Sequence, residues 1–250
     1  ALKLAKIINN RTRVMYIREK YIAGETIIYR ERMKRIVEKG KKRAPKSQPT
    51  SEKVWQNNLR YSIFKLTLIL NANFKPGDLL LLLTYENEPE KEKAAVYLRN
   101  FFRSVQRKCK KEGIDFKRVA VTERRGTRLH HHIVCNNIPM RIIKESWPHG
   151  RIFHKPLWDY PNYADLASYL LKQAAKLYME DGDISKKRYT TSRNIVIPEG
   201  VEVEVNRGDI EAEPKPLKGY QIDEDSVQIY AKALREAYKE VQETIEDLIL

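Results

Sequence analysis

The chain has 250 residues and a formal net charge of +15, with 48 Lys and Arg against 33 Asp and Glu. This length can bury a large core without disulfides. Its two cysteines, Cys109 and Cys135, lack the CxxC spacing of a zinc finger. No apolar run in the sequence is long enough to span a membrane, so we expect a cytoplasmic protein with no membrane partner. The positive charge favours a polyanionic partner, and nucleic acid is the best candidate.

The charge is distributed unevenly along the chain. Residues 199–250 contain 14 acidic and 6 basic side chains, whereas residues 1–198 contain 42 basic and 19 acidic ones. We therefore predict a basic, poorly patterned N-terminal arm (1–49) with at most a short strand near Thr26–Tyr29, a central domain (50–198) and an acidic C-terminal extension (199–250) that carries a long helix. A DNA-contacting arm and a disordered, solvated arm explain the first part equally well.

The elements of the central domain follow from periodicity, alternation and turn residues. Helical spacing and N-cap chemistry predict a helix from Thr50 to about Leu70. A continuous leucine run bounded by a turn predicts a buried strand at its end. Two alternating segments separated by a tight turn predict an antiparallel hairpin. The remaining predicted elements, in chain order, are strand 79–85, helix 89–111, strands 117–123 and 128–136, helix 139–147, strand 151–157 and helix 163–178.

Three consecutive histidines, His130, His131 and His132, enter the second strand of the predicted hairpin. Alternate side chains of a strand share a face, so His130 and His132 point one way and His131 the other. Two imidazoles on one face form half of a metal site, although three solvated histidines at a sheet edge fit the pattern equally well. Glu123 can reach the same face across the hairpin. One carboxylate and two imidazoles suit Mg²⁺ or Mn²⁺, but Glu123 could equally be a salt-bridge partner at a sheet edge.

The predicted helix 163–178 carries a polar face with Tyr169, Lys172 and Gln173. A tyrosine beside a metal that grips a phosphate is a candidate nucleophile. Lys172, one turn further, could neutralise the phosphate or stabilise the ionised phenol. Gln173 is a possible additional ligand or an ordinary polar residue. Tyr163 falls on the apolar face, so we expect core packing there, as we do for the tryptophans Trp55, Trp147 and Trp158.

Three stretches in this order resemble the motifs of the HUH endonuclease superfamily, which includes the rolling-circle replication initiators. They are the strand end Leu82-Leu83-Thr84-Tyr85, the run His130-His131-His132, and Tyr169-Leu170-Leu171-Lys172. The middle position departs from the pattern, because the family usually has a bulky apolar residue where His131 stands. A closer resemblance, over roughly residues 45–200, is to replication-associated proteins of plasmids and mobile elements in Firmicutes. It is carried by Pro49-Thr50-Ser51-Glu52, Asn71-Ala72-Asn73-Phe74, Gly77-Asp78-Leu79, Thr122-Glu123 and Ser192-Arg193-Asn194.

The resemblance implies an α+β fold of the HUH endonuclease, RRM-like type: a central antiparallel sheet, with the histidines on central strands, flanked by helices. It implies nicking and transfer of single-stranded DNA by Tyr169, through a 5′-phosphotyrosine intermediate that starts rolling-circle replication. Lys172 would assist, His130, His132 and Glu123 would hold Mg²⁺ or Mn²⁺, and no small-molecule cofactor is expected. The implied partner is a single-stranded origin that could contain a hairpin.

Further expectations concern DNA contacts, partners and alternatives. The chain has no phosphate-binding GxxxxGK[ST] loop, so a host helicase is expected to unwind the DNA. A relaxase or transposase with the same chemistry is one alternative. A non-catalytic DNA-binding protein, with structural histidines and tyrosine, is another. The residues expected to contact DNA are Arg124, Arg125, Arg128, Lys176, Lys187, Arg188 and Arg193.

Overall fold

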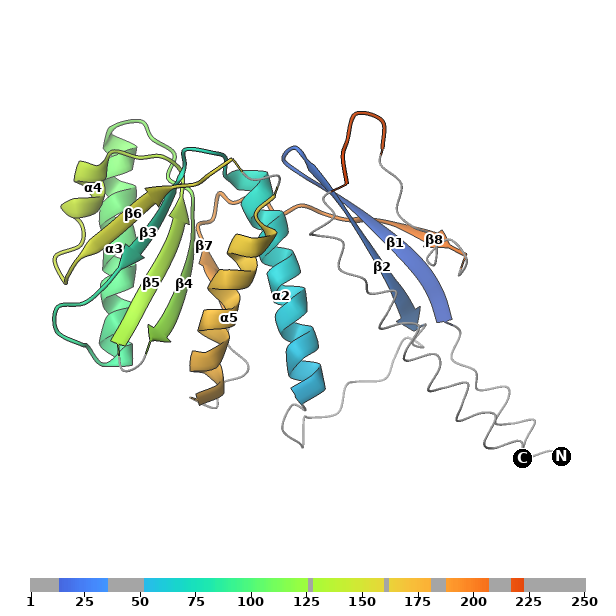
Figure 1. The fold of residues 1–250 in the computed structure, drawn as a ribbon. Coiled ribbons are helices and arrows are strands. Elements are labelled where there is room, and N and C mark those ends of the chain that lie inside the picture. The colour runs from blue at the N-terminus through green and yellow to red at the C-terminus, as the bar shows by residue number, and fades with distance from the viewer. Residues whose placement is uncertain are drawn as a thin grey trace. The chain divides into compact units, whose positions relative to one another are not determined.

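The structure, a computed structural model, describes residues 14–35, 52–125, 128–159, 162–180, 188–206 and 217–222 (Figure 1). The chain divides into two units. The larger comprises residues 22–26 and 46–198, and the smaller comprises residues 1–21, 27–45 and 199–250. The predicted C-terminal helix over 226–250 lies outside the described residues, as do residues 1–13 and 36–51 of the predicted arm and its link.

The larger unit is built on a five-stranded antiparallel sheet. Its strand order is β6-β3-β5-β4-β7, which places the histidine strand β5 at the centre, as predicted. The two-residue strand β7 lies in a stretch that the sequence marked only as basic. The strand bounds are β3 (Leu79–Leu83), β4 (Arg118–Arg125), β5 (Arg128–Cys135), β6 (Ile152–Pro156) and β7 (Thr190–Thr191).

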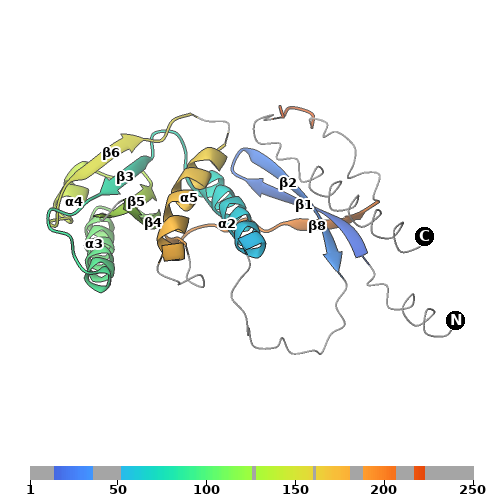
Figure 2. The same ribbon diagram turned by 60° about the horizontal axis from the view of Figure 1, so that its bottom comes forward.

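Helices cover both faces of this sheet (Figures 1 and 2). Helices α3 (Lys91–Lys111) and α4 (Met140–Lys144) share one apolar core with the sheet. Helices α2 (Glu52–Asn73) and α5 (Ala164–Glu180) share a second core with its other face. The predicted α+β class, an antiparallel sheet flanked by helices, is therefore confirmed.

The two covered faces explain the leucine run in β3. Leu81 and Leu83 pack in the core with α3, whereas Leu80 packs in the core with α2 and α5. A strand that is buried on both faces needs apolar side chains at every position, so it loses the alternation of a half-exposed strand. β5 pairs with β3 on one side and with β4 on the other, and this register places Glu123 directly opposite His130.

The smaller unit contains a three-stranded sheet of order β2-β1-β8, with β1 (Val14–Ala23), β2 (Thr26–Arg35) and β8 (Val201–Val205). Two strands of ten residues thus stand where the sequence predicted an irregular arm with at most one short strand. That prediction was wrong because charged side chains occupy inward-facing positions of this sheet.

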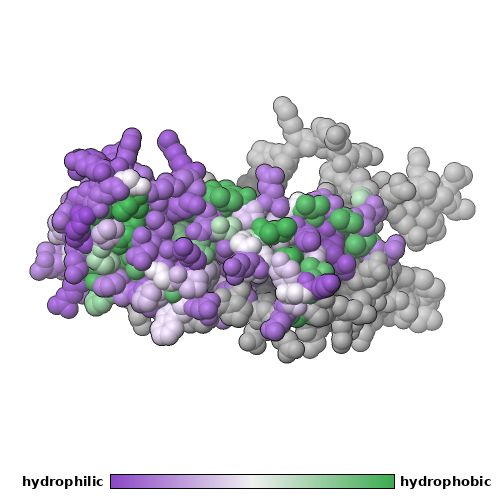
Figure 3. Space-filling model, turned by 90° about the horizontal axis from the view of Figure 1, so that it is seen from above, coloured by the Kyte–Doolittle hydropathy of each residue, from purple (hydrophilic) through white to green (hydrophobic). Residues whose placement is uncertain are grey.

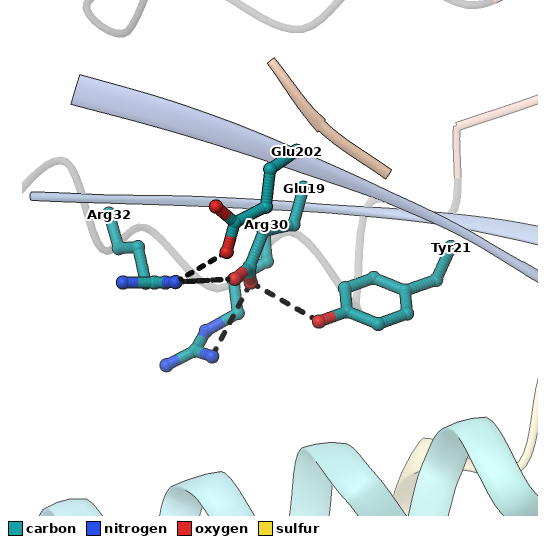
Figure 4. A network of polar contacts seen from close by, with 5 residues as sticks. All are labelled: Glu19, Tyr21, Arg30, Arg32 and Glu202. Carbon is teal, nitrogen blue, oxygen red and sulfur yellow. Dashed lines mark hydrogen bonds and ion pairs between the residues drawn. The ribbon is translucent and has the colours of Figure 1, made fainter. Parts of the chain in front are cut away.

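Glu19 shows how those charges are accommodated (Figure 4). It is only 5% exposed, and its Oε1 accepts a 2.9 Å hydrogen bond from Arg32. Its Oε2 lies 3.5 Å from the guanidinium of Arg30 and 3.3 Å from the hydroxyl of Tyr21, and Arg32 also bonds Glu202 at 3.0 Å. A buried carboxylate paired in this way stabilises a strand that composition alone marks as a charged arm.

Hydrophilic residues cover most of the surface that is visible in Figure 3, with scattered hydrophobic patches. Exposed valines contribute on β8, where Val201 and Val203 are 65% and 55% exposed. Within the described residues, no helix combines the length and the apolar character that crossing a bilayer would require.

Candidate active site

The site lies on the α5 side of β5. His130 and His132 point to this side, and Glu123 of β4 joins them. The side chains of His132 and Glu123 are 7% and 6% exposed, and that of His130 is 18% exposed. His132 Nε2 donates a 2.7 Å hydrogen bond to Glu123 Oε1, which lies 4.0 Å from His130 Nδ1. The structure therefore brings together the three predicted metal ligands.

Helix α5 places Tyr169 beside this cluster. The helix packs into its core through Ala167, Leu170, Leu171 and Ala174. Tyr169 lies at the margin of that buried stripe and is 48% exposed. Its ring meets the ring of His132 edge-on, with centroids 5.8 Å apart and an interplanar angle of 86°. A solvent-accessible phenol thus stands against one of the two imidazoles, and Lys172 is exposed one helical turn further on.

The donor set at this site suits a divalent cation. Donors at about 2.1 Å from one Mg²⁺ lie at most about 4.2 Å from each other, and both distances from Glu123 Oε1 to the imidazoles meet that limit. In the described part of the chain, however, no three His, Cys, Asp or Glu side chains stand arranged as a metal cage. His132 and Glu123 are hydrogen-bonded to each other instead, so an ion bound by both would replace that direct contact.

His131 has the opposite environment. It is 1% exposed, and its ring lies between two hydroxyl groups. Its Nε2 is 2.7 Å from Tyr85 Oη and its Nδ1 is 2.9 Å from Thr122 Oγ1. Burial, followed by the neighbouring His130 and His132, lowers the pKa of His131 to about 3. A neutral imidazole has one donor and one acceptor nitrogen, so the two hydroxyl groups satisfy it without a charge.

Aromatic rings surround His131 on this side of the sheet. Trp147 is 3% exposed, as predicted for a core residue, and its indole N–H donates to the carbonyl of Thr84 at 3.0 Å. Burial raises the pKa of Tyr85 well above its usual value. His149, expected at the surface or in contact with DNA, is half-buried, and its ring stacks on Tyr97 with centroids 3.9 Å apart.

The predicted core positions of two other aromatic residues have different outcomes. Tyr163 is 5% exposed and belongs to the apolar core under α5, as predicted. Trp158 is 63% exposed, so its prediction was wrong. It follows strand β6, whose residues 153–156 are also exposed.

The predicted DNA-contacting arginines have mixed environments. Arg128 donates to the backbone carbonyls of Tyr85 and Glu86, which ties the start of β5 to the segment after β3. Arg188 donates to the carbonyl of Asn58 on α2. Arg193 is exposed and Arg124 is half-buried. Lys187 and the side chains of Arg125, Gln173 and Lys176 lie outside what the structure describes.

Comparison with known proteins bears on this part of the chain. Residues 78–178 match the family model of the replication-associated protein ORF2. The match covers less than half of the chain, but it runs from the start of β3 into α5 and so includes all three motif stretches. Neither a curated protein nor a solved structure gave a match.

The sequence interpretation missed the two hydroxyl partners of His131. Alternation correctly placed His131 on the inner side, but Thr122 and Tyr85 were not assigned to it. The pairing register carries the signal for Thr122, because Thr122 stands directly opposite His131 in the β4–β5 ladder. Tyr85 lies two residues beyond Leu83, the β3 residue paired with His131, so a correct alignment of all three strands would have been needed to find it.

Proposed function

We propose that this protein nicks single-stranded DNA with Tyr169 and starts rolling-circle replication. The observation that carries the proposal is the juxtaposition of an exposed tyrosine with a buried histidine–carboxylate pair: the Tyr169 ring contacts His132, and His132 bonds Glu123 at 2.7 Å. The match of residues 78–178 to a replication-associated family supports the biological setting.

The reaction is a transfer at phosphorus. The Tyr169 oxygen loses its proton and forms a bond to the scissile phosphorus, and the bond from phosphorus to the 3′ oxygen breaks. The 3′ oxygen takes up a proton and leaves as a hydroxyl that primes synthesis, while the 5′ side remains on Tyr169 as a phosphotyrosine. A second transfer to a DNA 3′-hydroxyl reverses the bonding and rejoins the strand. Lys172 offsets the charge that develops on the phosphate.

His130, His132 and Glu123 would hold a divalent cation, Mg²⁺ or Mn²⁺. When bound, such an ion supplies Lewis-acid polarisation of a phosphoryl oxygen. Glu123 also has a role of its own, since its bond to His132 fixes the orientation of that imidazole. The hydrophobic packing of α5 holds Tyr169 in place, because Leu170 and Leu171 next to it are buried.

The proposal is tested by covalent trapping. The protein is incubated with Mn²⁺ and a labelled, single-stranded origin fragment from the element that encodes it. The expected product is a denaturant-resistant protein–DNA adduct together with a free 3′-hydroxyl end. Tyr169→Phe should abolish the adduct, and a chelator should prevent it.

The matched control is Tyr163→Phe, which removes a phenol oxygen just before the same helix, from a ring buried in the core. This variant should form the adduct as the wild type does. Persistence of the adduct in Tyr169→Phe would remove Tyr169 from the role of nucleophile. Tight binding with no cleavage of any single-stranded substrate would favour a non-catalytic DNA-binding protein.

A further inference from the structure

Helix α3 carries a concentration of positive charge on the side of the sheet away from the histidine site. Its 21 residues include eight Lys or Arg and one Glu. In α5, on the site's side, two basic and two acidic residues balance each other. The net charge of the larger unit is therefore displaced toward the face that the proposed chemistry does not use.

The exposed cations of α3 form one stripe. The helix is anchored by Ala94, Phe101, Val105 and Cys109, all of which are buried. On the opposite turns lie exposed cations, which we call the basic stripe: Arg99, Arg103, Arg107, Lys110 and Lys111. Arg99, Arg103 and Arg107 follow each other at four-residue steps, about 6 Å apart along the axis. A rigid helix thus presents the stripe over about 18 Å, roughly half a turn of duplex DNA.

Nearby acidic side chains do not neutralise the stripe. Glu112, just after the helix, pairs with Arg141 at 2.6 Å, and Glu145 pairs with Lys108 at 2.8 Å. Within the described residues, no member of the basic stripe forms an ion pair. A solvated surface helix usually alternates the signs of its charges, and five cations without a counterion instead form a ready contact for polyanions.

The aromatic residues of α3 distinguish between kinds of nucleic acid. Proteins that bind single strands combine cations with exposed aromatic rings on which bases stack. Here Phe102 is covered by the guanidinium of Arg118, 3.4 Å from its ring centroid, and Tyr97 is stacked on His149. Asn100 and Gln106, also exposed, supply only polar contacts. A face with cations and amides but no available ring suits the phosphates of a duplex.

We propose that the basic stripe of α3 binds the backbone of double-stranded DNA, without sequence preference. In the proposed reaction it would hold the duplex arm that flanks the single strand engaged at Tyr169. That role in the reaction rests on the proposed function, whereas duplex binding itself does not depend on it.

The test measures the affinity of the full chain for a mixed-sequence duplex and for one of its strands alone, over a range of salt concentrations. Arg103→Glu/Arg107→Glu should weaken duplex binding about tenfold to hundredfold and lower the salt slope by about two. Its affinity for the single strand should change less than about threefold. The milder Arg103→Gln/Arg107→Gln should give a smaller loss in the same direction, and circular dichroism confirms that both variants are folded.

A matched control reverses two exposed lysines outside α3, in Lys75→Glu/Lys155→Glu. The proposal is supported if the α3 variant loses much more duplex affinity than this control. Equal losses in the two variants would mean a general charge effect and would overturn it, as would an equal loss of single-strand affinity or wild-type binding with no preference for duplex.

Adduct formation on an unstructured single strand separates the two proposals. The α3 variant should form the Tyr169 adduct at the wild-type rate, because the basic stripe lies on the other face of the sheet from Tyr169. If the wild type forms no adduct, the proposed function fails while the duplex measurement still stands. If the adduct forms and duplex binding survives charge reversal, the α3 proposal alone fails.

Discussion

The two faces of strand β5 give adjacent histidines opposite environments. His131 faces the core under α3, where hydroxyl groups contact both of its ring nitrogens and burial keeps it neutral. His132 faces α5, where a carboxylate contacts one nitrogen and an exposed tyrosine ring lies against it. Both side chains are largely buried, so burial alone does not distinguish a structural histidine from a candidate ligand.

The partners make that distinction. Hydroxyl groups that can donate or accept satisfy a neutral imidazole on both sides and leave nothing for a cation. A carboxylate fixes one nitrogen and brings negative charge, which favours a bound cation. We therefore expect substitutions at His131 to affect mainly stability, and substitutions at His132 to affect mainly the reaction.

The largest expected effect is on the reaction. His132→Gln keeps an N–H that can still donate to Glu123 but removes the imidazole. Adduct formation should fall about thousandfold, since a proposed ligand is lost, and the free energy of unfolding should change by less than about 1 kcal/mol. Single-turnover nicking with Mn²⁺ and urea denaturation measure the two quantities.

His130→Gln is the companion variant on the same face and should behave similarly in the nicking assay. A large loss of stability in His132→Gln with unchanged nicking would reverse the roles assigned to the two faces. The assignment would also fail if His131→Gln and His132→Gln reduced nicking equally while both remained fully folded.

The second prediction concerns the buried face. His131→Ala leaves a cavity in a packed core and removes the partner of Tyr85 and Thr122. We expect a loss of about 2–4 kcal/mol in the free energy of unfolding. His130→Ala, at the more exposed position, should cost less than half as much. Equilibrium urea denaturation of both variants, without added metal, checks the difference, and equal losses would contradict it.

Much of this arrangement could be predicted from the sequence because it depends on strand alternation. The period of two assigned His130 and His132 to one face and His131 to the other. The same alternation aligned Glu123 with Val119 and Val121, and the valines now lie in the core on the α5 side. Such local patterns survive in the fold because both sheet faces are covered and a one-residue slip would bury the wrong set.

Other features depend on contacts between distant segments and could not be predicted. The strands β1 and β2 carry Glu19, Arg30 and Arg32, whose mutual pairing removes the penalty of burying charge, but their composition resembles a solvated arm. Trp158 is exposed although its residue type predicts a core position. The difference depends on which neighbours cover the edge strand β6, which no local pattern encodes.

The third prediction uses pH to probe the buried face. The pKa of His131 is about 3 in the folded chain and near 6.5 when it is unfolded. The unfolded state therefore binds more protons between these values, so the stabilising effect of keeping His131 neutral is complete above pH 6.5 and declines as the pH falls toward 3. Between about pH 7 and about pH 5 the wild type should lose about 2 kcal/mol relative to His131→Leu, which cannot titrate. Urea denaturation at both pH values measures this, and parallel pH profiles would show that His131 is protonated in the folded state.

The smallest effect is expected at Lys172, on the exposed side of the site. Lys172→Ala should slow nicking about tenfold, since one cation near the scissile phosphate is lost. Because the side chain is exposed, the free energy of unfolding should change by less than about 0.5 kcal/mol. Lys172→Arg keeps the charge and should recover most of the rate, which initial rates on a single-stranded substrate would measure. If Lys172→Ala nicks as fast as the wild type, Lys172 has no role in the reaction. If Lys172→Arg is as slow as Lys172→Ala, the compact ammonium group rather than the charge is required.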